Sequence, residues 1–277
     1  MRPATSSIQL DTGVTLPYRE HGDPAGTPMI LLHGYSDSLH SFDLLAPHLP
    51  ESLRAIAVTQ RGHGDADRPD GGYTPEQHAA DAAAVLDALG LEAALVVGHS
   101  AGGYTAQRFA LDHTERTLGI ALIAAFRGFD ADNAGVGELR EAVEALADPV
   151  DPGFVRDFQE SCFAEPVPTG FIDAVVAESL KLPARVWKAF LRGLLEAEAP
   201  SEAGTIAAPT LILWGDRDAF IPRADQDELA AAIPGAELVV YEGTGHCPHW
   251  EGPEPTAADL AAFARRASVA QRAASTF

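Results

Sequence analysis

The sequence predicts an α/β protein whose sheet is largely parallel and is covered by helices on both faces. Two observations support this prediction: short apolar segments of strand length recur along the chain, and longer amphipathic segments typical of helices separate them. A third is composition, with 46% apolar and 21% charged residues, which is ordinary for a globular protein. A chain of 277 residues has enough material to bury a large core and to form a deep pocket.

The first half of the chain contains most of the expected strands. A hairpin is expected first, with residues 7–10 and 14–19 joined by the turn Asp11-Thr12-Gly13. The elements expected after it are a strand at 29–32, a helix around 42–48, a strand at 54–59, a helix at 75–89 that Thr74 begins, a strand at 93–97, a helix from Tyr104 and a strand at 119–124.

The alternation stops between residues 127 and 208, which we expect to form an inserted helical lid. No convincing strand is present in this segment. Prolines divide it into several helices: Pro149, Pro152, Pro166, Pro168, Pro183 and Pro200. Its aromatic residues should mostly pack the lid onto the body, with a few lining the pocket: Phe154, Phe158, Phe163, Phe171, Trp187 and Phe190. The body is then made of residues 1–126 and 209–277, and its last elements are a strand at 210–214, a helix at 224–233, a strand at 238–241 and a helix at 256–267.

Charge and cysteine content exclude several classes of function. With 19 basic and 40 acidic residues the net charge is −21, which would repel the phosphate backbone of a nucleic acid.

No segment resembles a signal peptide or is long and apolar enough to cross a membrane, so we expect a cytoplasmic protein. We expect it to act on a small-molecule substrate as a monomer or homodimer. Cys162 and Cys247 are too few for a disulfide framework and lack metal-ligand spacing. We expect no cofactor and no metal.

The segment Gly98-His99-Ser100-Ala101-Gly102 is the most informative feature of the chain. It lies between an expected strand and an expected helix, so the backbone must turn sharply at Ser100. Such a turn strains the serine backbone, and a Cβ atom two residues before or after it would collide with its neighbours, which explains glycine at both places. The turn would expose the hydroxyl for attack as a nucleophile.

Distant residues should meet the serine at one edge of the sheet. Tyr35, Ser100, Asp218 and His246 each follow the end of an expected strand, and ligands of open α/β sheets bind beyond the carboxyl ends of the strands. The chain order serine, aspartate, histidine is the one that this serine turn requires.

These motifs together resemble the α/β-hydrolase superfamily over nearly the whole chain outside the lid. The matching stretches are Leu32-His33-Gly34-Tyr35, Arg61-Gly62-His63-Gly64 with Arg68-Pro69, residues 98–103, Trp214-Gly215-Asp216-Arg217-Asp218 with Pro222, and Gly245-His246 with Glu251 and Pro253. The resemblance implies an α/β-hydrolase fold, with a mostly parallel eight-stranded sheet and an inserted helical cap.

The resemblance also assigns catalytic roles. It implies that Ser100 is the nucleophile, that His246 is the general base and that Asp218 orients the imidazole. A histidine suits this role because its pKa lies near neutral pH, so it can take the serine proton and later return it to the leaving group. Asp216 competes with Asp218, but it falls inside a tight turn where a short side chain caps backbone N–H groups. Asp130, which follows the expected strand at 119–124, is a more distant substitute for the acid that orients His246.

Backbone donors should stabilise the tetrahedral intermediate. The N–H groups of Ala101 and Tyr35 are expected to form the oxyanion hole, although Tyr35 could instead only cap its strand. Among the other histidines, His99 should point away from the hydroxyl and His33 should shape its loop through backbone hydrogen bonds. A metal site built from His246, Cys247 and His249 is disfavoured because Pro248 interrupts it.

The function expected from these residues is a cofactor-independent serine hydrolase of small or medium carboxylic esters. Relatives that open epoxides or remove halide carry a carboxylate at the nucleophile position, so serine argues against both reactions. The same triad could act on lactones, amides, C–C bonds beside a carbonyl, or in perhydrolysis, and a third possibility is a ligand sensor with little turnover.

Overall fold

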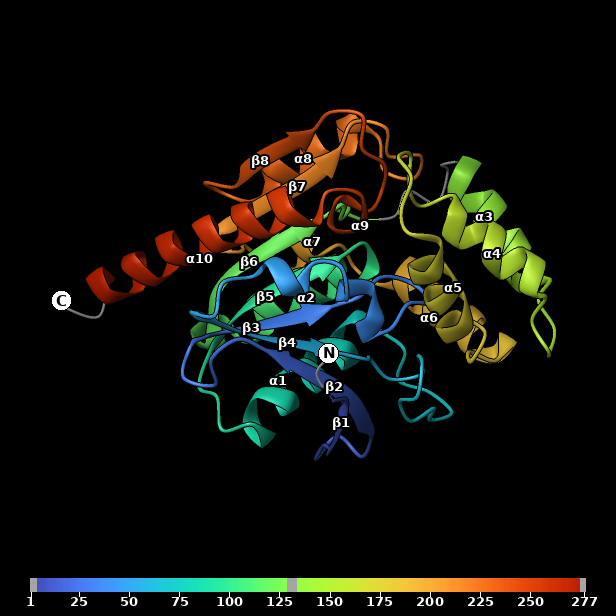
Figure 1. The fold of residues 1–277 in the computed structure, drawn as a ribbon, viewed down its shortest axis with the longest axis horizontal. Coiled ribbons are helices and arrows are strands. Elements are labelled where there is room, and N and C mark those ends of the chain that lie inside the picture. Colours follow the sequence, from blue (N-terminus) through green and yellow to red (C-terminus); the bar gives the residue numbers. More distant parts are fainter. Residues whose placement is uncertain (1–3, 129–133, 275–277) are drawn as a thin grey trace.

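An eight-stranded sheet forms the centre of the structure (Figure 1), a computed structural model that describes residues 4–128 and 134–274. The strand order is β1-β2-β4-β3-β5-β6-β7-β8; the pairs β1–β2 and β2–β4 are antiparallel and the other pairs are parallel. The strands are β1 (Ser6–Gln9), β2 (Thr15–His21), β3 (Thr27–Leu32), β4 (Leu53–Val58), β5 (Ala94–His99), β6 (Thr117–Ile123), β7 (Thr210–Gly215) and β8 (Glu237–Tyr241). The predicted α/β class and the mostly parallel sheet are confirmed.

Helices cover both faces of the sheet because alternate residues of each strand point to opposite sides. In β3, Ile30 and Leu32 belong to the core that contains residues of α1 (Pro75–Ala88), α2 (Ala101–Asp112) and α8 (Arg223–Ala232). Met29 and Leu31 belong to the other core, which contains residues of α10 (Pro253–Ala274). All four strand residues are at most 1% exposed, as expected for a sheet buried on both faces.

Local sequence explains where the helices begin and end. The hydroxyl of Thr74 accepts from the backbone N–H of Gln77, so Thr74 caps α1 as predicted. The single helix expected around residues 42–48 is wrong. Two short 3₁₀ helices occur there, η1 (Leu39–Phe42) and η2 (Ala46–His48), because Pro47 has no N–H for a continuous α-helical ladder. The remaining short elements are η3 (Thr114–Arg116) and α9 (Pro248–Glu251).

Residues 127–208, here called the helical insertion, connect β6 to β7. Their described part contains helices and no strand: α3 (Ala134–Glu144), α4 (Pro152–Glu160), α5 (Thr169–Ser179), α6 (Ala184–Glu196) and α7 (Pro200–Ala203). Helices α3 to α6 lie together at one end of the molecule, on the right in Figure 1. Side chains of the insertion, including Phe171, Trp187 and Phe190, form a third core with Tyr35 and Ala101 of the α/β body. The insertion therefore packs directly on the residues that follow β3 and β5.

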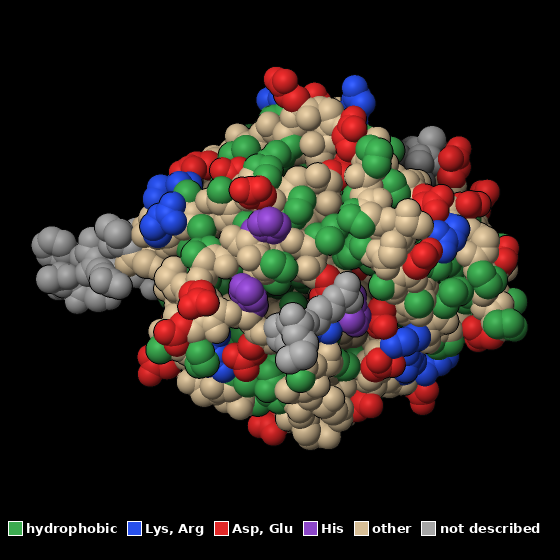
Figure 2. Space-filling model, viewed as in Figure 1, with side chains coloured by type: hydrophobic (Ala, Val, Ile, Leu, Met, Phe, Trp, Pro, Cys, Tyr) green, Lys and Arg blue, Asp and Glu red, His purple; other side chains and the backbone are tan. Residues whose placement is uncertain are grey.

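The surface agrees with the acidic composition. Figure 2 shows carboxylate side chains scattered over the visible face, in greater number than lysine and arginine side chains. In the parts of the chain described, no helix has the length and apolar character needed to span a membrane.

Candidate active site

Ser100 lies at the sharp turn between β5 and α2, in a left-handed backbone conformation with φ 51° and ψ −117°. A Cβ atom added at Gly98 would be 2.1 Å from the carbonyl oxygen of Gly102, and one added at Gly102 would be 2.2 Å from the carbonyl oxygen of Leu32. Both approaches are shorter than any real Cβ contact, so glycine is required at these two positions. The backbone around Ser100 thus has the strain and the close packing expected of a nucleophile turn.

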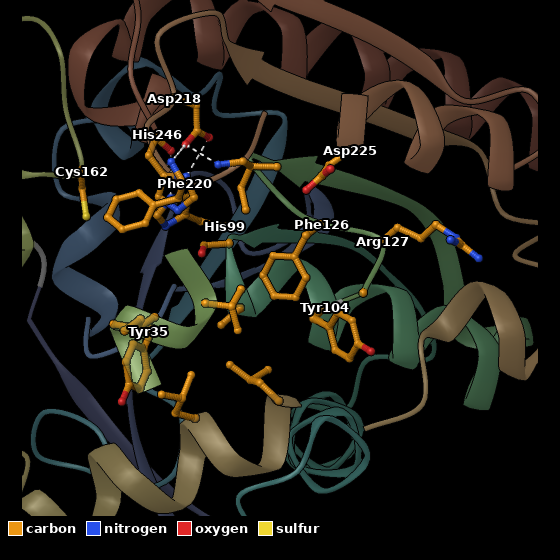
Figure 3. Close-up of a pocket in the computed structure, with 18 of the residues that line it drawn as sticks. Tyr35, His99, Tyr104, Phe126, Arg127, Cys162, Asp218, Phe220, Asp225 and His246 are labelled. Atoms are coloured by element: carbon orange, nitrogen blue, oxygen red, sulfur yellow. Dashed lines mark hydrogen bonds and ion pairs between the residues drawn. The ribbon is translucent and has the colours of Figure 1, made fainter. Parts of the chain in front are cut away.

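Asp218 and His246 form a buried hydrogen-bonded pair. Nδ1 of His246 lies 2.8 Å from Oδ2 of Asp218, and the two side chains are 6% and 0% exposed for His246 and Asp218 respectively (Figure 3). The other oxygen of Asp218 accepts from the backbone N–H groups of Phe220 at 2.8 Å and Ile221 at 3.0 Å. The carboxylate is therefore fixed by its own loop, and it can orient the imidazole in one tautomer.

The competing carboxylate has a different role. Asp216 accepts from the backbone N–H of Gly243 at 2.7 Å and caps the loop after β8, as its position in a tight turn predicts. It is exposed, and His246 has its carboxylate contact with Asp218 instead. Asp130 lies outside the described residues.

Ser100, His246 and Asp218 line the same cavity, which has a volume of about 1110 Å³. In the described part of the chain no hydrogen bond joins the Ser100 hydroxyl to His246. Hydrogen bonds of this kind are often long in the absence of substrate and shorten in the reacting complex. The cavity therefore contains a strained serine and an oriented imidazole that a substrate can reach together.

Two backbone N–H groups of residues that line this cavity have no hydrogen-bond partner among the described residues. Among the described residues, the N–H groups of Tyr35 and Ala101 donate to no other atom, and both residues line the cavity. The Ala101 N–H is free because this residue begins α2, where the first N–H groups of a helix have no intrahelical acceptor. The structure therefore brings Tyr35 and Ala101, the residues predicted to supply the oxyanion donors, to the same cavity as Ser100.

The cavity is lined both by apolar side chains and by carboxylates. Aromatic and aliphatic side chains of the body and of the helical insertion form the walls: Tyr35, Tyr104, Phe126, Leu139, Phe158, Cys162, Leu191, Leu194, Phe220 and Ile221. Besides Asp37 and Asp218, five carboxylates lie among the lining residues: Glu138, Glu198, Glu202, Asp225 and Glu228. Arg127 forms ion pairs with two of them, at 3.2 Å to Glu202 and 3.8 Å to Glu228. Figure 3 shows Arg127 and Asp225 on the side of the cavity away from Tyr35.

Comparison with known proteins identifies the family. Residues 29–259 match the family profile described as "Alpha/beta hydrolase family". The chain belongs to this family. It is 31% identical over 245 residues to 2-hydroxymuconate semialdehyde hydrolase from Pseudomonas sp. (strain CF600), and the match covers 83% of each chain.

This alpha/beta hydrolase is also similar to part of a longer protein and to a solved esterase structure. It is 29% identical over 251 residues to the dihydrolipoyllysine-residue acetyltransferase component of the acetoin cleaving system of Cupriavidus necator; the match covers 86% of this chain and 63% of that protein, less than two thirds of its length. The solved structure of the esterase RhEst1 from Rhodococcus sp. ECU1013 superposes with a TM-score of 0.81 at 27% identity, covering 96% of this chain and 99% of the esterase.

A buried polar cluster lies beside the Ser100 site of this hydrolase, and the sequence motifs did not predict it. Asp37 and Gln159 are 3% and 0% exposed, line the cavity, and are joined by a 3.0 Å hydrogen bond from the Gln159 amide to the carboxylate. The Ser41 hydroxyl donates to the same carboxylate at 3.2 Å. Burial raises the pKa of Asp37 to about 7, although these hydrogen bonds and His246 favour its charged form. The one available signal was the position of Asp37, two residues after the predicted oxyanion donor.

His99 and His249 complete this cluster. The rings of His99 and His246 are 4.9 Å apart and those of His99 and His249 are 4.5 Å apart. Nε2 of His99 lies 3.1 Å from the carbonyl oxygen of His246, so His99 supports the loop that carries the proposed base. Burial is the main reason why the pKa of each of these two histidines is lowered, that of His249 to about 3. Both side chains are therefore neutral near pH 7.

His33 and the two cysteines are buried. Nδ1 of His33 lies 2.9 Å from the carbonyl oxygen of Gly34 and its Nε2 accepts from the backbone of Gln60 at 3.0 Å, which agrees with the loop-shaping role predicted for it. Cys162 and Cys247 are both buried free thiols. No group of three or more histidine, cysteine or acidic side chains suited to a metal ion occurs among the residues that the structure describes.

Proposed function

We propose that this alpha/beta hydrolase cleaves small or medium carboxylic esters by a serine mechanism without a cofactor. The observation that carries the proposal is the 2.8 Å contact between His246 and the buried carboxylate of Asp218, in the same cavity as the strained Ser100. A serine hydroxyl is a weak nucleophile near pH 7, and this arrangement supplies the base that it needs.

In the first half of the reaction, Nε2 of His246 takes the Ser100 proton while Oγ attacks the ester carbonyl. Negative charge then develops on the former carbonyl oxygen, and the N–H groups of Tyr35 and Ala101 stabilise it. Asp218 stabilises the imidazolium and keeps its Nδ1–H directed toward the carboxylate. His246 next protonates the departing alkoxide, which leaves an acyl group on Ser100.

In the second half, water attacks the acyl-enzyme with His246 again acting as base. The tetrahedral intermediate collapses, the proton returns to Ser100 and the carboxylic acid leaves. We propose that residues 127–208 act as the lid that shapes the acyl site, since Phe158, Leu191 and Leu194 from this insertion line the cavity.

A second candidate is hydrolysis of a substrate related to 2-hydroxymuconate semialdehyde by the same three residues. The 31% identity to the Pseudomonas hydrolase of that name favours this reaction over hydrolysis of lactones or amides. Product analysis with such a substrate and with ester substrates distinguishes the two candidates.

The experiment that tests the proposal is a panel of p-nitrophenyl esters of increasing acyl length assayed with the wild type and with Ser100→Ala. We expect multiple turnovers of at least the short esters, with an initial burst when deacylation is slow, and a loss of at least about 10⁴-fold in kcat for Ser100→Ala. A variant that keeps most of the activity would exclude the serine mechanism, and stoichiometric labelling without turnover would indicate a ligand sensor.

A further inference from the structure

The loop that carries the oxyanion donor Tyr35 is attached to the helical insertion at two places. After β3 the chain continues through Tyr35, Ser36 and Asp37, and Ser36 has a left-handed backbone conformation with φ 65°. A residue other than glycine holds this conformation only when its surroundings impose it. The N–H of Tyr35 precedes Ser36 directly, so the direction in which it points depends on how this loop is held.

Gln159, near the end of α4, makes the first attachment. Its side-chain amide nitrogen lies 3.0 Å from each of three acceptors, the Ser36 hydroxyl, the Asp37 carboxylate and the Ser179 hydroxyl of α5, which share its two N–H donors. All four residues are buried, with exposures of 0–3%. One side chain of the insertion therefore bonds two consecutive loop residues in a place where water does not compete.

The Tyr35 side chain makes the second attachment. Its hydroxyl donates to the backbone carbonyl of Trp187 in α6 at 2.6 Å. Its ring contacts three aromatic rings of the insertion, those of Phe158, Trp187 and Phe190, at centroid distances of 5.9, 5.0 and 5.6 Å. The residue that supplies the N–H is thus fixed by the insertion through its own side chain.

We propose that Gln159 is a positioning residue for the oxyanion hole: by bonding Ser36 and Asp37 it sets the direction of the Tyr35 N–H, so that the site is complete only when α4 is seated. This inference rests on the serine mechanism proposed above. Gln159 acts on the transition state through Tyr35, and it need not touch the substrate. Substrate binding depends mainly on the apolar walls, whereas charge stabilisation depends on where that N–H points.

Gln159→Met tests the inference because it keeps the length of the side chain and removes its donors. We expect kcat for a short p-nitrophenyl ester to fall about 10- to 100-fold while KM changes less than about threefold, since an oxyanion donor that is displaced costs rate and not ground-state binding. Butaneboronic acid forms a tetrahedral adduct with a serine hydroxyl, and its inhibition constant should rise by about the same factor as kcat/KM falls. Gln159→Glu, which has the same shape but accepts where glutamine donates, should show the same direction of change.

Glu160→Gln is the matched control on the same helix. Glu160 is exposed and pairs with Arg156 on the surface, so this variant should keep the kcat, the KM and the boronic acid affinity of the wild type. A folded Gln159→Met with unchanged kcat, or one that raises KM alone, would refute the inference.

Tyr35→Phe tests the same coupling if both Gln159 variants fail to fold. It removes the bond to Trp187 and leaves the backbone N–H in place, so we expect kcat to fall several-fold at constant KM, and an unchanged kcat would refute the inference. Failure of this inference is separable from failure of the serine mechanism, because Ser100→Ala tests the mechanism independently.

Discussion

Both oxygens of the Asp218 carboxylate are occupied, one by Nδ1 of His246 at 2.8 Å and the other by two backbone N–H groups of its own loop. A carboxylate held in this way has little freedom to turn away from the imidazole. Its loop and the loop of His246 come from β7 and β8, which are neighbours in the sheet. The sheet therefore fixes the distance between the two loops.

Asp218→Asn should reduce kcat by about 10⁴-fold, because an amide favours the tautomer of His246 that cannot accept the serine proton. Asp216→Asn is the matched control in the same loop and should keep activity within about tenfold. The measurement is ester hydrolysis under saturating substrate with both purified variants. Comparable losses in the two variants would remove the basis for assigning the acid to Asp218.

Gly98→Ala should destabilise the protein strongly, by more than about 3 kcal/mol, since the new methyl group would be 2.1 Å from the carbonyl oxygen of Gly102. Gly71→Ala is the control: a Cβ atom there meets nothing within 4 Å, and a change of at most about 0.5 kcal/mol is expected. Urea unfolding of both variants measures the difference. A Gly98→Ala protein of normal stability would show that the turn can relax.

His63 should make the fold sensitive to acid. Burial lowers its pKa from 6.5 to about 4, so the unfolded chain binds a proton between these pH values and the folded protein does not. The corresponding stability is present above about pH 6.5 and is lost as the pH falls toward 4, by about 3 kcal/mol. The free energy of unfolding of His63→Gln, measured from pH 7 to 4.5, should fall less steeply than that of the wild type. Parallel curves would contradict the shifted pKa.

Asp37 should have the opposite effect on stability. Burial raises its pKa from 3.8 to about 7, so its contribution is fully present below about pH 4 and is lost as the pH rises through 7. Relative to the wild type, Asp37→Asn should therefore become more stable as the pH rises from 4 to 7, by a total on the order of 4 kcal/mol. Urea unfolding of the two proteins across this range measures the change. A difference that stays constant with pH would show that Asp37 titrates normally.

The sequence predicted the strands well, because each is a short apolar segment with a turn at its end. The prediction was wrong around residues 42–48, where one helix was expected and the structure has two short 3₁₀ helices, because Pro47 interrupts the helical hydrogen bonds. The catalytic candidates were predictable because each follows a strand, and the ends of parallel strands meet at one edge. The contact of Gln159 with Asp37 was not, since 122 residues separate them and only the seating of α4 brings them together.

The two thiols also bear on how inhibition of this hydrolase should be interpreted. Cys162 lines the cavity, whereas Cys247, next to His246 in the chain, is 0% exposed and burial raises its pKa. An alkylating reagent that enters the cavity would add bulk at Cys162, in the same cavity as Ser100. Inactivation by such a reagent would then reflect blockage of the cavity, and it would be no reason to classify the protein as a cysteine-dependent enzyme.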